Sequence, residues 1–140
     1  METKRSDTVI DFSRKKFLII DDFSSFRSLL KRMLQSMRVS DIDDTFNGED
    51  AVNKMSLKKY DIVLCDYNLG EGKDGQQVLE EGKGRGFIGY STIFMMITAE
   101  NISELIMGAL EYQPDEYPMK PFNKSTLEKK WRISIERRKI

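Results

Sequence analysis

Short apolar runs alternate with longer amphipathic stretches along the chain. Three runs are short and apolar enough to form buried strands: residues 16–20, 60–66 and 91–98. Two more polar segments are expected to be extended as well: residues 41–46 and 115–122. Helical spacing of apolar side chains marks five further stretches: residues 24–37, 47–59, 76–86, 100–112 and 124–140. Strand and helix therefore alternate five times with short connections, which predicts an α/β protein with a parallel sheet and helices on both faces.

Side chains that cap helices mark where two of these helices begin. Ser24 or Ser25 is expected to cap the first helix, and Asn123 or Ser125 the last. Three glycines are expected to fray the third helix, because glycine lowers helix stability.

The composition limits the classes of function and the compartment. The chain has 140 residues, equal numbers of acidic and basic residues, and a single cysteine, Cys65. Zero net charge gives no argument for nucleic acid binding, and no run is long and apolar enough for a membrane helix. A single cysteine fits a reducing compartment, so a cytoplasmic location is expected. We expect residues 1–14 to be a disordered lead and residues 15–140 to form one domain.

The absence of histidine excludes several kinds of chemistry inside this chain. Ser-His-Asp and Cys-His catalysis, histidine-ligated zinc and phosphohistidine formation all need that residue. A bound metal would rely mainly on oxygen ligands, which favours Mg²⁺. Charge is also uneven, since residues 41–74 contain nine acids and four bases and residues 124–140 contain seven bases and two acids. A local cation site is therefore compatible with overall neutrality.

Polar side chains follow the predicted strands at the points where the strands end. They are Asp21, Asp22, Asp66, Thr98 and Lys120. Ligands of open α/β sheets bind outside the carboxyl ends of the strands, so these side chains are expected to converge. A single Asp there is more often a helix cap or a solvated turn residue, but clustered carboxylates repel one another unless a cation offsets them. The set predicts a Mg²⁺ site, with Thr98 and Lys120 as donors to a neighbouring phosphate-sized anion.

These residues, with the stretch "DDFSSFR" at 21–27, resemble the receiver domain of two-component response regulators. The resemblance implies a flavodoxin-like, doubly wound, five-stranded parallel sheet of order 2-1-3-4-5 with five helices. It also implies that Asp66 is the phosphoacceptor. Mg²⁺ would be held by Asp22, Asp66 and the backbone carbonyl of Asn68. Asp21 would reach the ion through a water molecule.

The same resemblance implies roles for residues around the phosphoryl group. Lys120 would pair with that group, Thr98 would close on it, and Tyr117 would be the aromatic switch residue. Asn68 and Glu100 would gate the water that hydrolyses the phosphoryl group. Both are polar and leave room for water, so we expect a short-lived phosphoryl group, which the decay of a phosphorylated sample would test.

Two features concern the loop after Asp66 and the fifth extended segment. Gly70 stands where the family usually has proline, and Gly75 comes nine residues after Asp66, one more than usual. One inserted residue is expected to alter the shape of this loop and to leave the chemistry of the site in place. In the fifth segment, the Lys120–Pro121 peptide bond is expected to be cis, as it usually is in the family.

These implications predict a phosphorylation-dependent signalling switch that catalyses only its own phosphoryl transfer and dephosphorylation. The phosphoryl donor would be a histidine kinase or a phosphotransfer protein, because this chain has no histidine. Phosphorylation would remodel the face formed by the last two helices and the fifth strand. Spare apolar side chains predict that this face binds a downstream protein or a second receiver as a homodimer: Ile106, Leu110 and Ile133. Direct nucleic acid binding and membrane insertion are not expected.

Two other classes of protein stay open. One is a Mg²⁺-dependent phosphatase with an aspartyl nucleophile, as in the haloacid dehalogenases, but these need a second Asp where this chain has Asn68. The other is a receiver-like scaffold with a vestigial site, and the completeness of the residue set argues against it. Turnover of a generic phosphomonoester would favour the phosphatase, and failure to bind Mg²⁺ would favour the scaffold.

Overall fold

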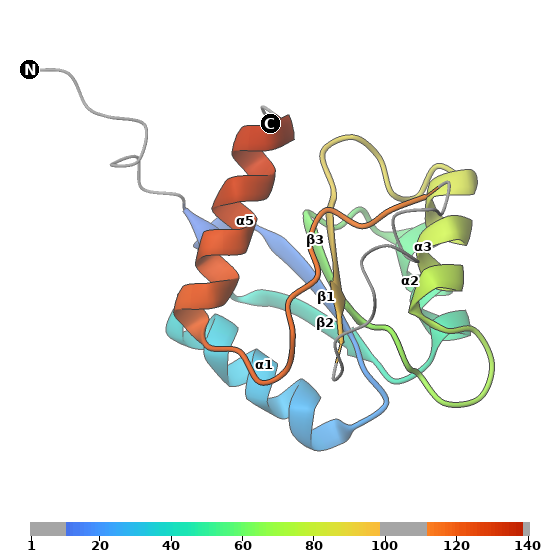
Figure 1. Cartoon of the computed structure of the whole chain (residues 1–140), viewed down its shortest axis with the longest axis horizontal. Coiled ribbons are helices and arrows are strands. Elements are labelled where there is room, and N and C mark those ends of the chain that lie inside the picture. Colours follow the sequence, from blue (N-terminus) through green and yellow to red (C-terminus); the bar gives the residue numbers. More distant parts are fainter. Residues whose placement is uncertain (1–10, 99–111, 139–140) are drawn as a thin grey trace, which may run out of the picture.

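The structure is a computed structural model, and it describes residues 11–98 and 112–138. Strands and helices alternate in the order that the sequence predicts (Figure 1). Their bounds are η2 Phe12–Arg14, β1 Lys16–Ile20, α1 Ser24–Ser36, β2 Asp41–Thr45, α2 Gly48–Leu57, β3 Ile62–Asp66, α3 Gly75–Gly84, β4 Ile93–Ile97 and α5 Lys124–Arg138. Among the described residues, no helix is long and apolar enough to cross a membrane.

The four strands form one parallel sheet in the order β2-β1-β3-β4, which agrees with the expected order as far as it extends. Beyond β4, the next extended segment pairs in parallel through two isolated bridges, Met95 with Glu116 and Thr98 with Met119. Proline contributes to this incomplete pairing. Pro118 has no N–H to donate, although its carbonyl accepts a hydrogen bond from the Thr98 N–H at 3.1 Å.

The expected five strands and five helices are therefore described only in part. Within residues 11–98 and 112–138 the structure has a four-stranded sheet and four α-helices. The helix expected over residues 100–112 falls almost entirely outside the described residues.

Successive side chains of the strands point to opposite faces of the sheet and build two hydrophobic clusters. Leu18 and Val63 belong to the cluster that α2 and α3 cover. Phe17 and Leu64 belong to the cluster that α1 and α5 cover. Figure 1 shows these two pairs of helices on opposite sides of the sheet. Burial on both faces explains why β1, β3 and β4 are almost entirely apolar in sequence.

Residues 12–14 form a short helix, whereas the sequence predicts a disordered lead that includes them. Phe12 lies in the short helix η2 and is 8% exposed. Its ring centroid is 3.8 Å from the ring of Trp131 on α5. A disordered lead of residues 1–14 is therefore wrong for residues 12–14, because Phe12 finds an apolar partner that is distant in sequence.

The helix starts agree only partly with the expected caps. Neither serine caps α1, which begins at Ser24 after the backbone turns at Phe23. That turn is fixed from outside the helix, because the Asp21 carboxylate accepts a hydrogen bond from the Phe23 N–H at 2.9 Å. At α5 the expected cap is confirmed, since the Asn123 side chain accepts a hydrogen bond from the Thr126 N–H at 2.9 Å.

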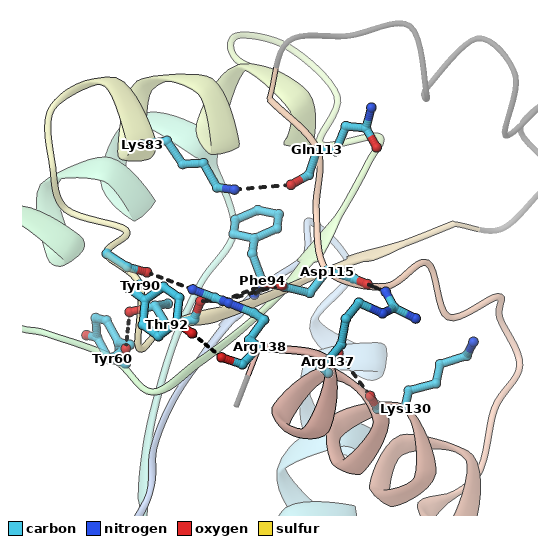
Figure 2. Close-up of polar contacts among 12 residues, drawn as sticks. Tyr60, Lys83, Tyr90, Thr92, Phe94, Gln113, Asp115, Lys130, Arg137 and Arg138 are labelled. Atoms are coloured by element: carbon cyan, nitrogen blue, oxygen red, sulfur yellow. Dashed lines mark hydrogen bonds and ion pairs between the residues drawn. The ribbon is translucent and has the colours of Figure 1, made fainter. Parts of the chain in front are cut away.

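The end of α5 holds the start of the fifth extended segment beside β4 (Figure 2). Arg138 donates to the Thr92 carbonyl at 2.6 Å and lies 3.3 Å from both carboxylate oxygens of Asp115. Asp115 in turn accepts a hydrogen bond from the Phe94 N–H at 2.8 Å. The Arg138 guanidinium also stacks on the Tyr90 ring, 4.9 Å from its centroid. These contacts fix the position from which the segment continues toward the carboxyl end of the sheet.

Candidate functional site

Three carboxylates meet at the carboxyl end of the sheet. Asp21 and Asp22 directly follow β1, and Asp66 is the last residue of β3. One ligand atom of each lies within 4.8 Å of the other two. Asp21 and Asp66 are 1% and 5% exposed, whereas Asp22 is exposed to solvent. The structure therefore brings together the three acids that the sequence placed at the strand ends.

Lys120 brings a positive charge to these acids from the fifth segment. Its ammonium lies 3.0 Å from Oδ2 of Asp21 and 3.3 Å from Oδ2 of Asp66. The backbone N–H of Lys120 donates to the Thr98 carbonyl at 2.7 Å, so the residue is fixed beside the end of β4. The Lys120–Pro121 peptide bond is cis, as expected. Thr98 itself is 5% exposed and lines the same cavity as Lys120.

The electrostatic balance of the site is negative. Burial raises the pKa of the Asp66 carboxyl to about 6, and the neighbouring charge of Asp21 adds to this effect. Lys120 and a hydrogen bond from the backbone of Asn68 act in the opposite direction on that pKa. Since burial and the charge of Asp21 together outweigh these two effects, the folded protein disfavours the charged form of Asp66.

The residues at the site fit a hard divalent cation. Two of the three carboxylates, those of Asp22 and Asp66, line a cavity of about 670 Å³ together with Asn68. Such ions prefer carboxylate and carbonyl oxygens, and they offset the repulsion between clustered acids. The Asp cluster could therefore hold a metal ion.

The loop between β3 and α3 forms one wall of the cavity. Gly70 and Gly72 have backbone φ angles of 76° and 85°, which residues other than glycine rarely adopt. The loop is fastened to α2, because the Glu49 carboxylate accepts a hydrogen bond from the Lys73 N–H at 3.2 Å. At its end Asp74 caps α3 by accepting from the Gln77 N–H at 2.8 Å. The loop after Asp66 is one residue longer than is usual in the family, as the sequence indicates. The positive φ angles of its two glycines and its contact with α2 accommodate this extra length.

The structure describes some of the residues expected to act as switch or output residues, and others lie outside the described residues. Tyr117 is partly buried against the cluster that α2 and α3 cover. Ile133 is 39% exposed on α5. Glu100, Ile106 and Leu110 lie outside the described residues.

Two residues of α1 that the sequence did not assign to the site contact it directly. The ring centroid of Phe26 is 4.1 Å from the Lys120 ammonium. Arg27 donates from Nη1 to the Asp21 carbonyl at 2.8 Å and from Nε to Asp44 at 2.9 Å. Phe26 has the helical spacing of a core residue, and the sequence signal that could have assigned it to the site is its place in the stretch 21–27, just after the acidic pair.

The architecture and this cluster agree with one protein family. The family model described as "Response regulator receiver domain" matches residues 17–132. The chain belongs to this family. A receiver domain is a component of two-component signal transduction, and the flavodoxin-like α/β fold expected from the resemblance is confirmed for the described elements.

Individual relatives of this receiver domain include chemotaxis proteins. Chemotaxis protein CheY-3 of Vibrio cholerae is 30% identical over 122 residues, which cover 87% of this chain and 92% of that protein. Chemotaxis protein CheY of Pseudomonas aeruginosa is 26% identical over 122 residues, covering 87% of this chain and 97% of that protein.

Solved structures share the fold at lower identity. The signal receiver domain of a putative Luxo repressor protein from Vibrio parahaemolyticus has a TM-score of 0.75 and 21% identity, covering 90% of this chain and 93% of that chain. Vibrio cholerae chemotaxis protein CheY4 has a TM-score of 0.73 and 22% identity, covering 86% of this chain and 98% of that chain. These likenesses support the receiver fold.

Proposed function

We propose that this receiver domain is a phosphorylation-dependent signalling switch and that Asp66 accepts its phosphoryl group. The observation that carries the proposal is the buried carboxylate of Asp66, which lines the cavity and lies 3.3 Å from the ammonium of Lys120. The donor is a histidine kinase or a phosphotransfer protein, because this chain has no histidine of its own. Its only catalysis is its own phosphoryl transfer and dephosphorylation.

The proposed transfer uses the side chains already gathered at the cavity. An oxygen of Asp66 forms a bond to phosphorus while the bond between phosphorus and the donor's imidazole nitrogen breaks, and that nitrogen keeps the electron pair. Lys120 moves from the Asp66 carboxylate to a phosphoryl oxygen, and the hydroxyl of Thr98 donates to another. Because the transition state carries much charge and makes few new bonds, positioning and charge stabilisation supply most of the acceleration.

The cation proposed for the site is Mg²⁺. Asp22, Asp66 and the backbone carbonyl of Asn68 would hold it, and Asp21 would reach it through water. When bound, Mg²⁺ offsets the negative charge that the carboxylates and the phosphoryl group bring together. Asn68, which lines the cavity, would orient the water that later removes the phosphoryl group, and Glu100, which is outside the described residues, would assist it.

The output of the switch is proposed to lie on the face formed by the fifth segment, α5 and the helix expected over residues 100–112. Thr98 would move toward the phosphoryl group and make room for Tyr117, which is already partly buried against the sheet. The partner is a downstream protein or a second receiver. Ile133 is a described apolar residue exposed on α5, and Ile106 and Leu110 would extend the patch.

Intact-mass analysis after incubation with acetyl phosphate and Mg²⁺ tests the acceptor. Wild-type protein should gain one phosphoryl group, and removal of Mg²⁺ with a chelator should prevent the gain. Asp66→Asn should gain none, whereas Asp50→Asn, which removes an acid from α2, should behave like wild type. An equal adduct on Asp66→Asn would show that another residue is the acceptor. Multiple turnover of a generic phosphomonoester would instead favour an aspartyl phosphatase.

A further inference from the structure

An aromatic ring lies against the ammonium of Lys120 in the site. The Nζ atom of Lys120 is 4.1 Å from the centroid of the Phe26 ring, well within the range of a cation–π interaction. The Lys120 side chain is 17% exposed, so water screens this contact only weakly. The contact brings together the first turns of α1 and the end of the fifth segment, which are distant in sequence.

The ring is itself held in place. Phe26 packs against Phe122 in a T-shaped arrangement, with ring centroids 6.1 Å apart and an angle of 77° between the rings. Both residues border the hydrophobic cluster that α1 and α5 cover. The ring beneath Lys120 therefore has a fixed position in the fold, unlike the ring of an exposed aromatic residue.

The other partners of the ammonium change during the proposed reaction. In the structure it bonds Asp21 and Asp66, at 3.0 and 3.3 Å. Phosphorylation converts the Asp66 carboxylate into an acyl phosphate, so Lys120 must exchange that contact for a phosphoryl oxygen. An aromatic face attracts a cation through its quadrupole and does not take up its hydrogen-bonding protons as a carboxylate does. Phe26 can therefore stay in contact with Lys120 before, during and after the exchange.

We propose that Phe26 is a positioning residue that holds the ammonium of Lys120 ready for the phosphoryl group. It acts through Lys120 and touches no reacting atom. A flexible lysine side chain has many rotamers, and the ring restricts them to those that keep the ammonium in the cavity. The inference rests on the proposed function for its kinetic consequence, whereas the contact itself can be tested independently.

The alternative is a purely structural role, in which Phe26 only fills space between α1 and Phe122. Fluorination separates the two roles, because each fluorine weakens the negative face of the ring with little change in its shape. Wild-type protein is compared with variants carrying 4-fluoro, 3,5-difluoro or 3,4,5-trifluoro phenylalanine at position 26. The rate of Asp66 phosphorylation by acetyl phosphate with Mg²⁺ should fall stepwise along the series, by roughly tenfold in total.

Two further variants are controls for packing. Phe26→Leu keeps an apolar side chain but removes the ring, and should be slowed as much as the trifluoro variant. The same trifluoro analogue at Phe17, which is 1% exposed in the core and packs edge-on against Trp131, should leave the rate unchanged. A flat rate along the series at position 26, or an equal fall at Phe17, would overturn the proposal.

A spectroscopic readout tests the contact without phosphorylation. The ring current of Phe26 should shift the Lys120 Hε resonances upfield in the unphosphorylated protein, and Phe26→Leu should abolish that shift. An absent shift in wild type would contradict the contact. If wild type shows the shift but takes up no phosphoryl group, the proposed function fails while the Phe26–Lys120 contact stands. If phosphorylation proceeds normally and fluorination has no effect, only the positioning role fails.

Discussion

At the scale of single residues, Asp66 has more negative than positive surroundings. Asp21 and Asp22 lie close to it, and Lys120 divides its ammonium between Asp21 and Asp66. Burial and the charge of Asp21 raise the pKa of Asp66 to about 6, so the folded state disfavours its charged form. A buried carboxylate that is placed for binding a ligand lowers the stability of the folded protein when that ligand is absent.

We therefore expect Asp66→Asn to raise the free energy of unfolding, by about 1 kcal/mol in chelator-treated protein at neutral pH. The amide relieves the repulsion from Asp21 and leaves the Asp21–Lys120 ion pair intact. Urea unfolding followed by circular dichroism measures the change. Glu71→Gln removes a charge from the exposed loop nearby and should alter stability by less than about 0.5 kcal/mol. A variant less stable than wild type would contradict this account, whereas added Mg²⁺ should narrow the difference.

At the scale of elements, α3 shows why glycines in one helix are not equivalent. Gly82 is buried where α3 meets the chain that follows it, and an added Cβ would lie 2.8 Å from Cγ1 of Ile88. Gly84 has no atom within 4 Å of the same position. The sequence predicts that both glycines weaken the helix, but in the structure Gly82 permits close packing and Gly84 has no such role.

The two glycines give a matched pair of alanine variants. Gly82→Ala should lower the free energy of unfolding by about 1–2 kcal/mol, because the new methyl group overpacks against Ile88. Gly84→Ala should raise it by about 0.5 kcal/mol, because alanine favours the helix and restricts the unfolded chain. Urea titrations under one set of conditions compare the two. If both variants moved in the same direction, packing at Ile88 would not be the deciding factor.

At the scale of the whole molecule, α5 contacts both the short helix η2 and the fifth segment, which carries Lys120 into the site. Trp131 packs on Phe12 near the N-terminus, and Arg138 holds Asp115 at the start of the fifth segment. Lys130 adds an ion pair to Glu116 at 3.1 Å. Because the fifth segment carries Lys120, a displacement of this segment would change both the cavity and the contacts with α5.

Ile133 tests whether that face is the output surface. Ile133→Asp should abolish association that depends on phosphorylation, with a partner or a second receiver, because it puts a charge into the apolar patch. Asp66 phosphorylation should be unaffected. Analytical ultracentrifugation with and without acetyl phosphate, or a partner pull-down, measures this. Leu57→Asp changes a residue on α2 that is 80% exposed and should associate like wild type. Normal association of Ile133→Asp would place the output surface elsewhere.

The sequence by itself determined the four described strands, their parallel arrangement and the acids of the site. Continuous apolar runs are typical of strands buried on both faces, and parallel strands bring their carboxyl ends to one edge. Asp21, Asp22 and Asp66 therefore had to meet once the strands were assigned. Lys120 and Thr98 followed from the same argument and from the family resemblance. These inferences depend on local patterns and on the geometry of a parallel sheet.

Only the tertiary structure decided the contacts between elements that are remote in sequence. Phe26 borders an apolar cluster, as its helical spacing indicates, but that spacing does not reveal its contact with Lys120. Phe12 lies in the stretch predicted to be a disordered lead, yet its ring contacts Trp131. The start of α1 likewise depends on the Asp21 carboxylate, and not on the serines of the helix itself. Periodicity reports which face of an element is buried. It does not report which side chain of another element meets that face, because that depends on how the elements pack.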